Sequence, residues 1–127
     1  MNVLIFGTFD HLHPGHEFVI TEAMKRGDAT VIVARDRNVA RIKGRSSEQN
    51  EQERLQAIAQ KFPAATVLLG DAEDFLRPVR EIQPDLVLLG YDQKFPPGVE
   101  EKDLPCQAER LPPYREGEFK SSKRRQK

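Results

Sequence analysis

The chain has little of what several classes of protein depend on. It contains one cysteine, Cys106, no tryptophan, two tyrosines and seven phenylalanines in 127 residues. A single cysteine excludes an internal disulfide framework, and we interpret Cys106 as an incidental or partly buried thiol. No apolar run approaches the length of a membrane span, and no signal-peptide pattern follows Met1. We therefore expect a cytoplasmic protein that makes no contact with membranes.

Charge of one sign is also missing, because 20 basic residues balance 20 acidic ones. The local exception is the stretch 120–127, which has five Lys or Arg residues and no acid. Such short basic runs are usually solvated, and no aromatic residue is interleaved here to stack on bases. We do not predict nucleic-acid binding. The length predicts one domain, 1–127, with a short basic tail at 120–127.

Short apolar runs alternate with amphipathic stretches along the chain. The runs predict buried parallel strands, and they are Val3–Phe6, Thr30–Ala34, Thr66–Leu69 and Leu86–Leu89. Helical stripes lie between them, at 17–25, 55–62 and 75–82. Ser46 and Gln49 form a possible capping box for the second helix, and Pro78 indicates that the third helix starts late or kinks.

This alternation predicts an α/β fold, with a single Rossmann-like, doubly wound parallel sheet. In such sheets ligands bind outside the carboxyl ends of the strands, where the strand order reverses. We expect the loops that follow Phe6, Ala34 and Leu89 to converge there. The Pro-rich stretch 95–113 is interpreted as a long, partly irregular excursion.

The most informative segment is 7–16, with the sequence GTFDHLHPGH. Gly7 follows a strand and allows close backbone approach to a ligand. Pro14 and Gly15 favour a turn into a helix, whose first N–H groups attract anions. His13 and His16 are spaced i, i+3 and should project to one side, so that two imidazoles flank an anion site.

Two alternatives remain open for this segment. The three histidines, spaced H-x-H-x-x-H, could form a zinc site, although no Cys or carboxylate with ligand spacing accompanies them. Asp10 could contact the ligand or could instead cap backbone N–H groups of a turn.

The pattern G-T-F-D-x-x-H-x-G-H after a strand resembles the H-x-G-H nucleotidyltransferase superfamily, which includes cytidylyltransferases and adenylyltransferases. The segment GYDQKF at 90–95 is similar to archaeal-type FAD synthases, where glycerol-3-phosphate cytidylyltransferases have G-D-D-W. The resemblance implies the nucleotidyltransferase fold and covers nearly the whole chain.

Site residues follow from the resemblance. It implies that His13, His16 and Lys43 are catalytic, and it implies nucleotide contacts from Thr8, Phe9, His13, Gly15, His16, Arg54, Asp92, Ser121 and Ser122. From the residues alone, Lys43 could lie in a solvated loop, and Arg54 could form i, i+4 surface pairs. Ser121 and Ser122 could be a plain helix cap or a frayed end, since the segment 114–123 departs from the cytidylyltransferase pattern.

The resemblance implies transfer of NMP from an NTP to a phosphorylated acceptor with release of pyrophosphate, and the favoured reaction is ATP plus FMN to FAD. An acceptor phosphate is already anionic, so this reaction needs alignment and charge neutralisation more than a strong base. Mg²⁺ is expected to bind through the phosphates of the substrate, without a metal site built from protein ligands.

Three other functions remain open. The chain could be a cytidylyltransferase that uses CTP and glycerol 3-phosphate or a similar ester. It could bind nucleotides without turnover, or be an RNA-modifying fragment, although it lacks an RNA-binding module. Because relatives commonly pair, we also expect a homodimer.

Overall fold

The computed structural model describes residues 1–96 and 98–113, except the side chain of Ile42. Its elements in chain order are β1 (Asn2–Gly7), α1 (Pro14–Arg26), β2 (Asp28–Val33), α2 (Asp36–Lys43), α3 (Glu51–Lys61), β3 (Thr66–Leu69), α4 (Leu76–Ile82), β4 (Leu86–Leu89), the 3-10 helix η1 (Glu101–Asp103) and β5 (Gln107–Arg110). The predicted site residues Ser121 and Ser122 lie outside the described residues.

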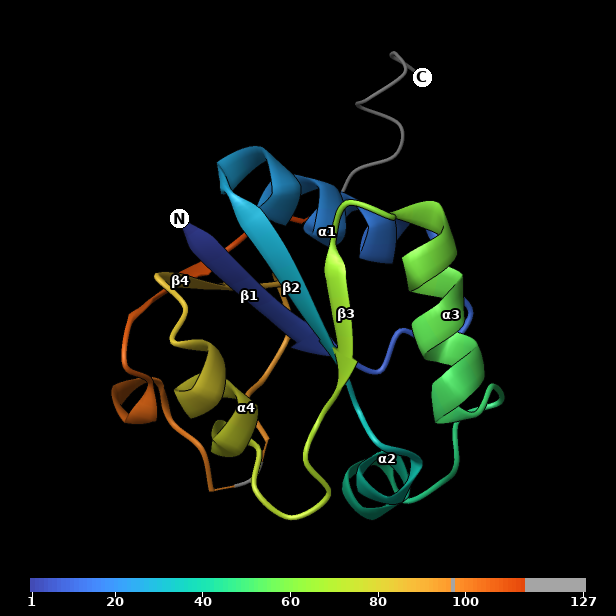
Figure 1. The fold of residues 1–127 in the computed structure, drawn as a ribbon. Coiled ribbons are helices and arrows are strands. Elements are labelled where there is room, and N and C mark those ends of the chain that lie inside the picture. The colour runs from blue at the N-terminus through green and yellow to red at the C-terminus, as the bar shows by residue number, and fades with distance from the viewer. Residues whose placement is uncertain (97, 114–127) are drawn as a thin grey trace.

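The five strands form one parallel sheet in the order β3-β2-β1-β4-β5. The chain first moves outward from β1 through β2 to β3, and then crosses back to β4 and β5 (Figure 1). The predicted α/β, doubly wound, Rossmann-like sheet is confirmed. The strand order reverses between β1 and β4, so the carboxyl ends of these two strands border the expected ligand crevice.

Alternate residues of the strands supply two cores, one on each face of the sheet. One core packs α1 and α3 against residues such as Val3, Ile5 and Val31. The other packs α4 and the segment around η1 against Leu4, Phe6 and neighbouring side chains. The continuous apolar runs of β1 and β4 are therefore explained by burial on both faces.

Several predicted boundaries were wrong. The strand β2 covers Asp28–Val33 instead of Thr30–Ala34, whereas the first helix begins at Pro14, at the turn predicted to open it. The second long helix is capped by Asn50, whose side chain accepts from the N–H of Glu53, so Ser46 and Gln49 are not its capping box. Asn50 with Glu53 gives the same reciprocal pattern closer to the apolar stripe.

Two elements were missed. The helix α2 was not among the predicted helices, and Lys43, for which a loop was considered, is its last residue, followed by Gly44 in the left-handed conformation. Three of the four residues of the strand β5 are polar and exposed, and Ala108 alone is apolar, so the strand has no apolar signature. The late start of the third helix is confirmed, since Pro78 lies in the first turn of α4, where its missing N–H breaks no helical bond.

Candidate active site

The loop that leaves β1 is shaped by one aromatic ring. Phe9 has a φ of 56° and a buried side chain that packs edge-on against the ring of His16, with centroids 5.4 Å apart. A Cβ at residue 7 would lie 3.1 Å from the Phe9 ring, so the glycine is needed for this close approach. The loop therefore turns toward the start of α1 directly after the strand.

His13 and His16 lie together as predicted. Their rings are stacked with centroids 3.6 Å apart and planes 20° from parallel. His13 is the N-cap of α1, and its Nδ1 accepts from the backbone N–H groups of Gly15 and His16 at 3.1 and 3.3 Å. In return, the N–H of His13 donates to Nδ1 of His16 at 3.4 Å. The pair forms a capping box made of imidazoles instead of Ser and Glu.

This capping box fixes the proton positions of both rings. Because each Nδ1 accepts a backbone N–H, each neutral ring must carry its proton on Nε2. Burial, and then the neighbouring charges of His13 and Lys43, lower the pKa of His16 to about 4. His16 is therefore neutral at pH 7, and it offers an Nε2–H donor.

The first N–H groups of α1 are not free, which corrects one expectation. Those of Gly15 and His16 are bound by His13, and residue 14 is a proline without a donor. A Cβ at residue 15 would lie 3.0 Å from Cε1 of His13, so Gly15 leaves room for the ring to fold back onto the helix. In this conformation the imidazoles, rather than the helix amides, supply the donors at this end of α1.

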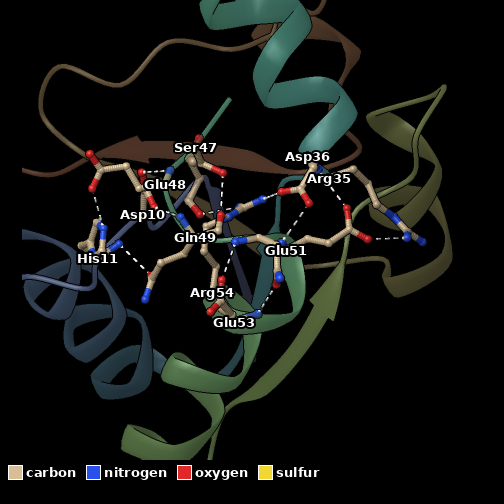
Figure 2. Close-up of polar contacts among 12 residues, drawn as sticks. Asp10, His11, Arg35, Asp36, Ser47, Glu48, Gln49, Glu51, Glu53 and Arg54 are labelled. Atoms are coloured by element: carbon tan, nitrogen blue, oxygen red, sulfur yellow. Dashed lines mark hydrogen bonds and ion pairs between the residues drawn. The ribbon is translucent and has the colours of Figure 1, made fainter. Parts of the chain in front are cut away.

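Asp10 bonds the loop after β1 to the segment that precedes α3. Its two carboxylate oxygens accept from the backbone N–H groups of Glu48 and Gln49 at 2.9 and 3.0 Å, and these bonds lower the pKa of Asp10. The neighbouring His11 donates its N–H to Oε1 of Gln49, while its ring pairs with Glu48 at 2.8 Å (Figure 2). The capping role considered for Asp10 is thus observed, although the amides that it caps lie far along the chain.

Arg54 is fully buried, with a relative exposure of 0%. Its guanidinium donates to the carbonyl of Thr8 at 2.7 Å, to the carbonyl of Gln49 at 3.1 Å and to Oδ1 of Asp36 at 2.7 Å (Figure 2). The alternative of i, i+4 surface pairs is therefore wrong. The side chain ties the loop after β1 to the starts of α2 and α3.

The ends of α2 and α3 are also locked to each other. The N–H of Asp36 donates to Oε1 of Glu51, and the N–H of Glu51 donates to Oδ2 of Asp36. The other oxygen of Glu51 accepts from Arg35, which also reaches the carbonyl of Gly70 after β3. This network joins the loops that follow β1, β2 and β3. Of the three loops expected to converge, those after Phe6 and Ala34 take part in it, whereas the loop after Leu89 is bonded separately to Phe6 through Gln93.

A small open pocket lies beside this network. Its lining residues come from the loop after β1, from α2 and from the segment that follows α2, and they are Thr8, Asp10, Val39, Lys43, Arg45, Ser46 and Ser47. Two cations and three hydroxyls line the pocket together with the Asp10 carboxylate, whose oxygens already accept backbone N–H groups, so most of this polar surface suits an anion. Lys43 thus lies next to the histidine loop, as predicted, and Arg45 joins it.

Asp92 lies in an exposed turn after β4, at the carboxyl edge of the sheet. Gln93 and Arg110, which sequence reasoning missed, hold this turn. The Gln93 amide bonds to Phe6 and Gly90, and the Arg110 guanidinium contacts carbonyls of the turn. The only signal for Gln93 was its place in the GYDQKF segment, and nothing in the sequence marked Arg110.

Residues 1–96 and 98–113 contain neither a metal-binding cluster nor a membrane-spanning helix. Within these ranges, no cluster of three or more His, Cys, Asp or Glu side chains is arranged to hold a metal ion. His11 pairs with Glu48 instead of joining the other two histidines. No helix in the same ranges is long and apolar enough to cross a membrane.

Comparison with known proteins agrees with this geometry. A family model described as cytidylyltransferase-like matches residues 4–122. An FAD synthase of Methanospirillum hungatei is 41% identical over 129 residues, covering 97% of this chain and 81% of the relative. An FAD synthase of Methanosphaerula palustris is 49% identical over 98 residues, which are 76% of this chain and 63% of the relative.

The fold also matches a solved structure. The crystal structure of a lipopolysaccharide core biosynthesis protein from Thermoplasma volcanium superimposes with a TM-score of 0.78 at 32% identity. The match covers 91% of this chain and 98% of that one. The predicted nucleotidyltransferase resemblance, with its similarity to archaeal FAD synthases, is confirmed. The parallel sheet, the histidine pair at the start of α1 and the extent of the family match together show that the chain belongs to the cytidylyltransferase-like family of nucleotidyltransferases.

Proposed function

We propose that this chain transfers AMP from ATP to the phosphate of FMN, producing FAD and pyrophosphate. The observation that carries the chemistry is the stacked pair His13 and His16, which presents two Nε2–H groups at the switch point of the sheet. The choice of FMN is supported by relatives called FAD synthases, one of which is matched over 81% of its length.

The reaction needs charge stabilisation more than proton transfer. A phosphate oxygen of FMN attacks the α-phosphorus of ATP, and the bond from that phosphorus to the oxygen bridging it to the β-phosphate breaks. Neutral imidazole donors stabilise the developing negative charge without having to lose a proton. The backbone N–H groups of Thr8 and Phe9 add further donors in the same loop. Prior alignment of the two phosphates supplies much of the acceleration.

The remaining residues act around this centre. Lys43, beside the pocket at Thr8, neutralises the leaving pyrophosphate. Arg54 acts as a positioning residue, because its guanidinium is buried against the carbonyl of Thr8. Asp92 contributes to the nucleotide pocket from the turn after β4. Gly15 serves by making room for the His13 ring. Contacts of Ser121 and Ser122 with the phosphates remain predictions.

Magnesium enters as part of the nucleotide substrate. The carboxylate of Asp10, the nearest candidate ligand in the loop, already accepts two backbone N–H groups. The other side chains that line the pocket are cationic or neutral, which suits a Mg²⁺ ion held by phosphate oxygens and water. We expect EDTA to abolish turnover and added Mg²⁺ to restore it.

The test is pyrophosphate release with ATP or CTP, each combined with FMN or glycerol 3-phosphate. Release with ATP and FMN only, with FAD identified by chromatography, is the expected result. His13→Ala and His16→Ala should each lose activity by about 100-fold or more, since each removes a preorganised donor. His11→Gln, which changes an exposed pair with Glu48, should lose far less.

Other outcomes would overturn this assignment in different ways. Release with CTP and glycerol 3-phosphate would make the chain a cytidylyltransferase. Nucleotide binding without release of pyrophosphate from any pair would favour a non-catalytic nucleotide-binding protein. Full activity in His16→Ala would remove the proposed role of the histidine pair.

A further inference from the structure

The side chain of Gln93 separates the two strands that border the switch point. Strands β1 and β4 are paired at Val3 with Leu86 and at Leu4 with Val87. Extended by two residues, this register would direct the carbonyl of Phe6 to the N–H of Gly90. Instead, the Phe6 carbonyl accepts from Nε2 of Gln93 at 2.6 Å, and the N–H of Gly90 donates to Oε1 of Gln93 at 3.0 Å.

The Gln93 amide therefore stands in for a peptide unit between two diverging strands. It offers one donor and one acceptor, which are the groups that the Phe6 carbonyl and the Gly90 amide need. Both backbone groups stay satisfied while the strand ends are held apart by the width of a side-chain amide. No other residue type of this length supplies both groups without charge.

Arg110 holds the same turn from the other side. It is the last residue of β5, and its Nη1 lies 2.9 Å from the carbonyl of Gly90, 3.2 Å from that of Tyr91 and 2.6 Å from that of Gln93. The turn is also closed by a bond from the N–H of Gln93 to the Gly90 carbonyl at 3.1 Å. Three of its four carbonyls thus converge on one cationic group.

The turn 90–93 is bonded to the strand end that precedes the histidine loop, and it carries exposed side chains. Phe6 immediately precedes Gly7, so Gln93 bonds the turn after β4 to the strand end that starts the loop. Tyr91 is 54% exposed, and Asp92 is exposed beside it. The side chains of the turn therefore border the crevice at a position fixed relative to the loop.

We propose that Gln93 and Arg110 are positioning residues for the nucleotide: they fix turn 90–93 and set the opening between β1 and β4. The inference rests on the proposed function only in that a nucleotide binds at the switch point. It does not depend on which acceptor is used. Loss of either residue should weaken nucleotide binding more than it lowers the stability of the fold.

The test is calorimetric binding of ATP and of CTP to the whole chain, with no acceptor present. Gln93→Glu replaces the donor to Phe6 with an oxygen, and Gln93→Leu removes both groups. Each variant should bind the preferred nucleotide at least tenfold more weakly than the unchanged protein. Gln60→Glu, the same change at an exposed position of α3, should stay within twofold.

Two substitutions at residue 110 distinguish the role of its positive charge from the role of its side-chain volume. Arg110→Lys keeps a cation with three N–H donors and should retain most of the nucleotide binding, whereas Arg110→Met should lose it.

Hydrogen exchange of the Gly90 amide should be faster in Gln93→Leu, because the N–H of Gly90 loses its acceptor. In turnover, KM for the nucleotide should rise while kcat changes little; a purely structural defect would lower kcat with KM unchanged.

The outcomes distinguish this inference from the proposed function. Folded Gln93→Glu and Gln93→Leu proteins that bind nucleotide within twofold of the unchanged chain would overturn the positioning role. Tight ATP binding by the unchanged chain without FAD formation would overturn the acceptor assignment and leave the Gln93 comparison valid. Absence of binding by the unchanged chain for both nucleotides would overturn both.

Discussion

At the scale of single residues, the chemistry depends on how two imidazoles are held. Each Nδ1 accepts backbone N–H groups of the same short motif, so each Nε2 must carry the proton. A histidine free to rotate would have to select tautomer and orientation when the substrate binds. The capping box of α1 makes that selection during folding, and the small residue at position 15 makes the capping box possible.

His16 should give the protein a specific pH dependence of stability. Its pKa is about 4 in the folded chain, below the ordinary value of 6.5, chiefly because it is partly buried. Between these two pH values the unfolded chain binds more protons than the folded one. The free energy of unfolding should therefore fall as the pH drops from 6.5 toward 4. Urea unfolding of the wild type at pH 7 and pH 5 measures this loss.

Two variants isolate the contribution of His16. His16→Gln keeps an acceptor for the N–H of His13 but does not titrate, so it should lose less stability between pH 7 and pH 5. His11→Gln, at an exposed histidine, should retain the loss seen in the wild type. Equal pH dependence in wild type and His16→Gln would show that the burial of His16 does not affect folding.

At the scale of elements, the site is assembled by joining loop and helix ends. The loop after β1, the start of α2 and the start of α3 meet at the buried Arg54, and the reciprocal bonds of Asp36 and Glu51 link the two helices. Figure 2 shows these contacts as one continuous network. The network explains how residues from separate βα units are kept in register around the pocket.

Arg54→Met should destabilise the protein and loosen the loop. The substitution keeps much of the apolar volume but removes the guanidinium donor of the Thr8 carbonyl and of Asp36, and leaves the Gln49 carbonyl with the Ser47 hydroxyl alone. Unsatisfied buried groups of this kind cost about 1–3 kcal/mol each, so we expect a loss of about 2–3 kcal/mol in the free energy of unfolding. Urea denaturation at pH 7 measures it.

An exposed arginine provides the matched control. Arg77→Met removes surface contacts with Asp71 and Glu81, and it should cost no more than about 1 kcal/mol. Similar losses in the two variants would contradict the proposed importance of the buried network. A stable Arg54→Met protein with normal activity would remove the positioning role of Arg54.

At the scale of the whole molecule, the doubly wound sheet brings the loops together and leaves two edge strands. β3 and β5 are the edges, and Leu68 on β3 is 41% exposed. The carboxyl ends of β1 and β4 support the histidine loop and the turn 90–93, respectively (Figure 1). For a chain of this size we expect only a shallow crevice at this edge of the sheet.

The chain is predicted to be a homodimer. Relatives in the resemblance commonly pair, and pairing would enclose a shallow crevice further. Static light scattering at micromolar concentration should give twice the chain mass of 14.5 kDa. A mass of one chain across the concentration range used for the activity measurements would contradict this prediction.

Much of this could be read from the sequence because the signals are local. Periodicity placed four of the five strands, since buried parallel strands are continuously apolar. The projection of His13 and His16 to one side follows from their spacing at a helix start, whereas the structure adds that the two rings stack. The strand β5 was not predicted because most of its side chains are polar. The helix α2 was not predicted because its short, charged sequence resembles a loop.

The sequence by itself determined the α/β alternation, the position of the histidine motif and membership in the family, because each depends on residues near one another in the chain. Only the tertiary structure decided the partners of Asp10, Arg54, Gln93 and Arg110. Apart from the Arg54–Gln49 and Gln93–Gly90 bonds, the hydrogen bonds of these side chains span from 17 to 87 residues. No local pattern encodes such pairs, since the burial and the geometry that select them exist only once the sheet has brought its loops together.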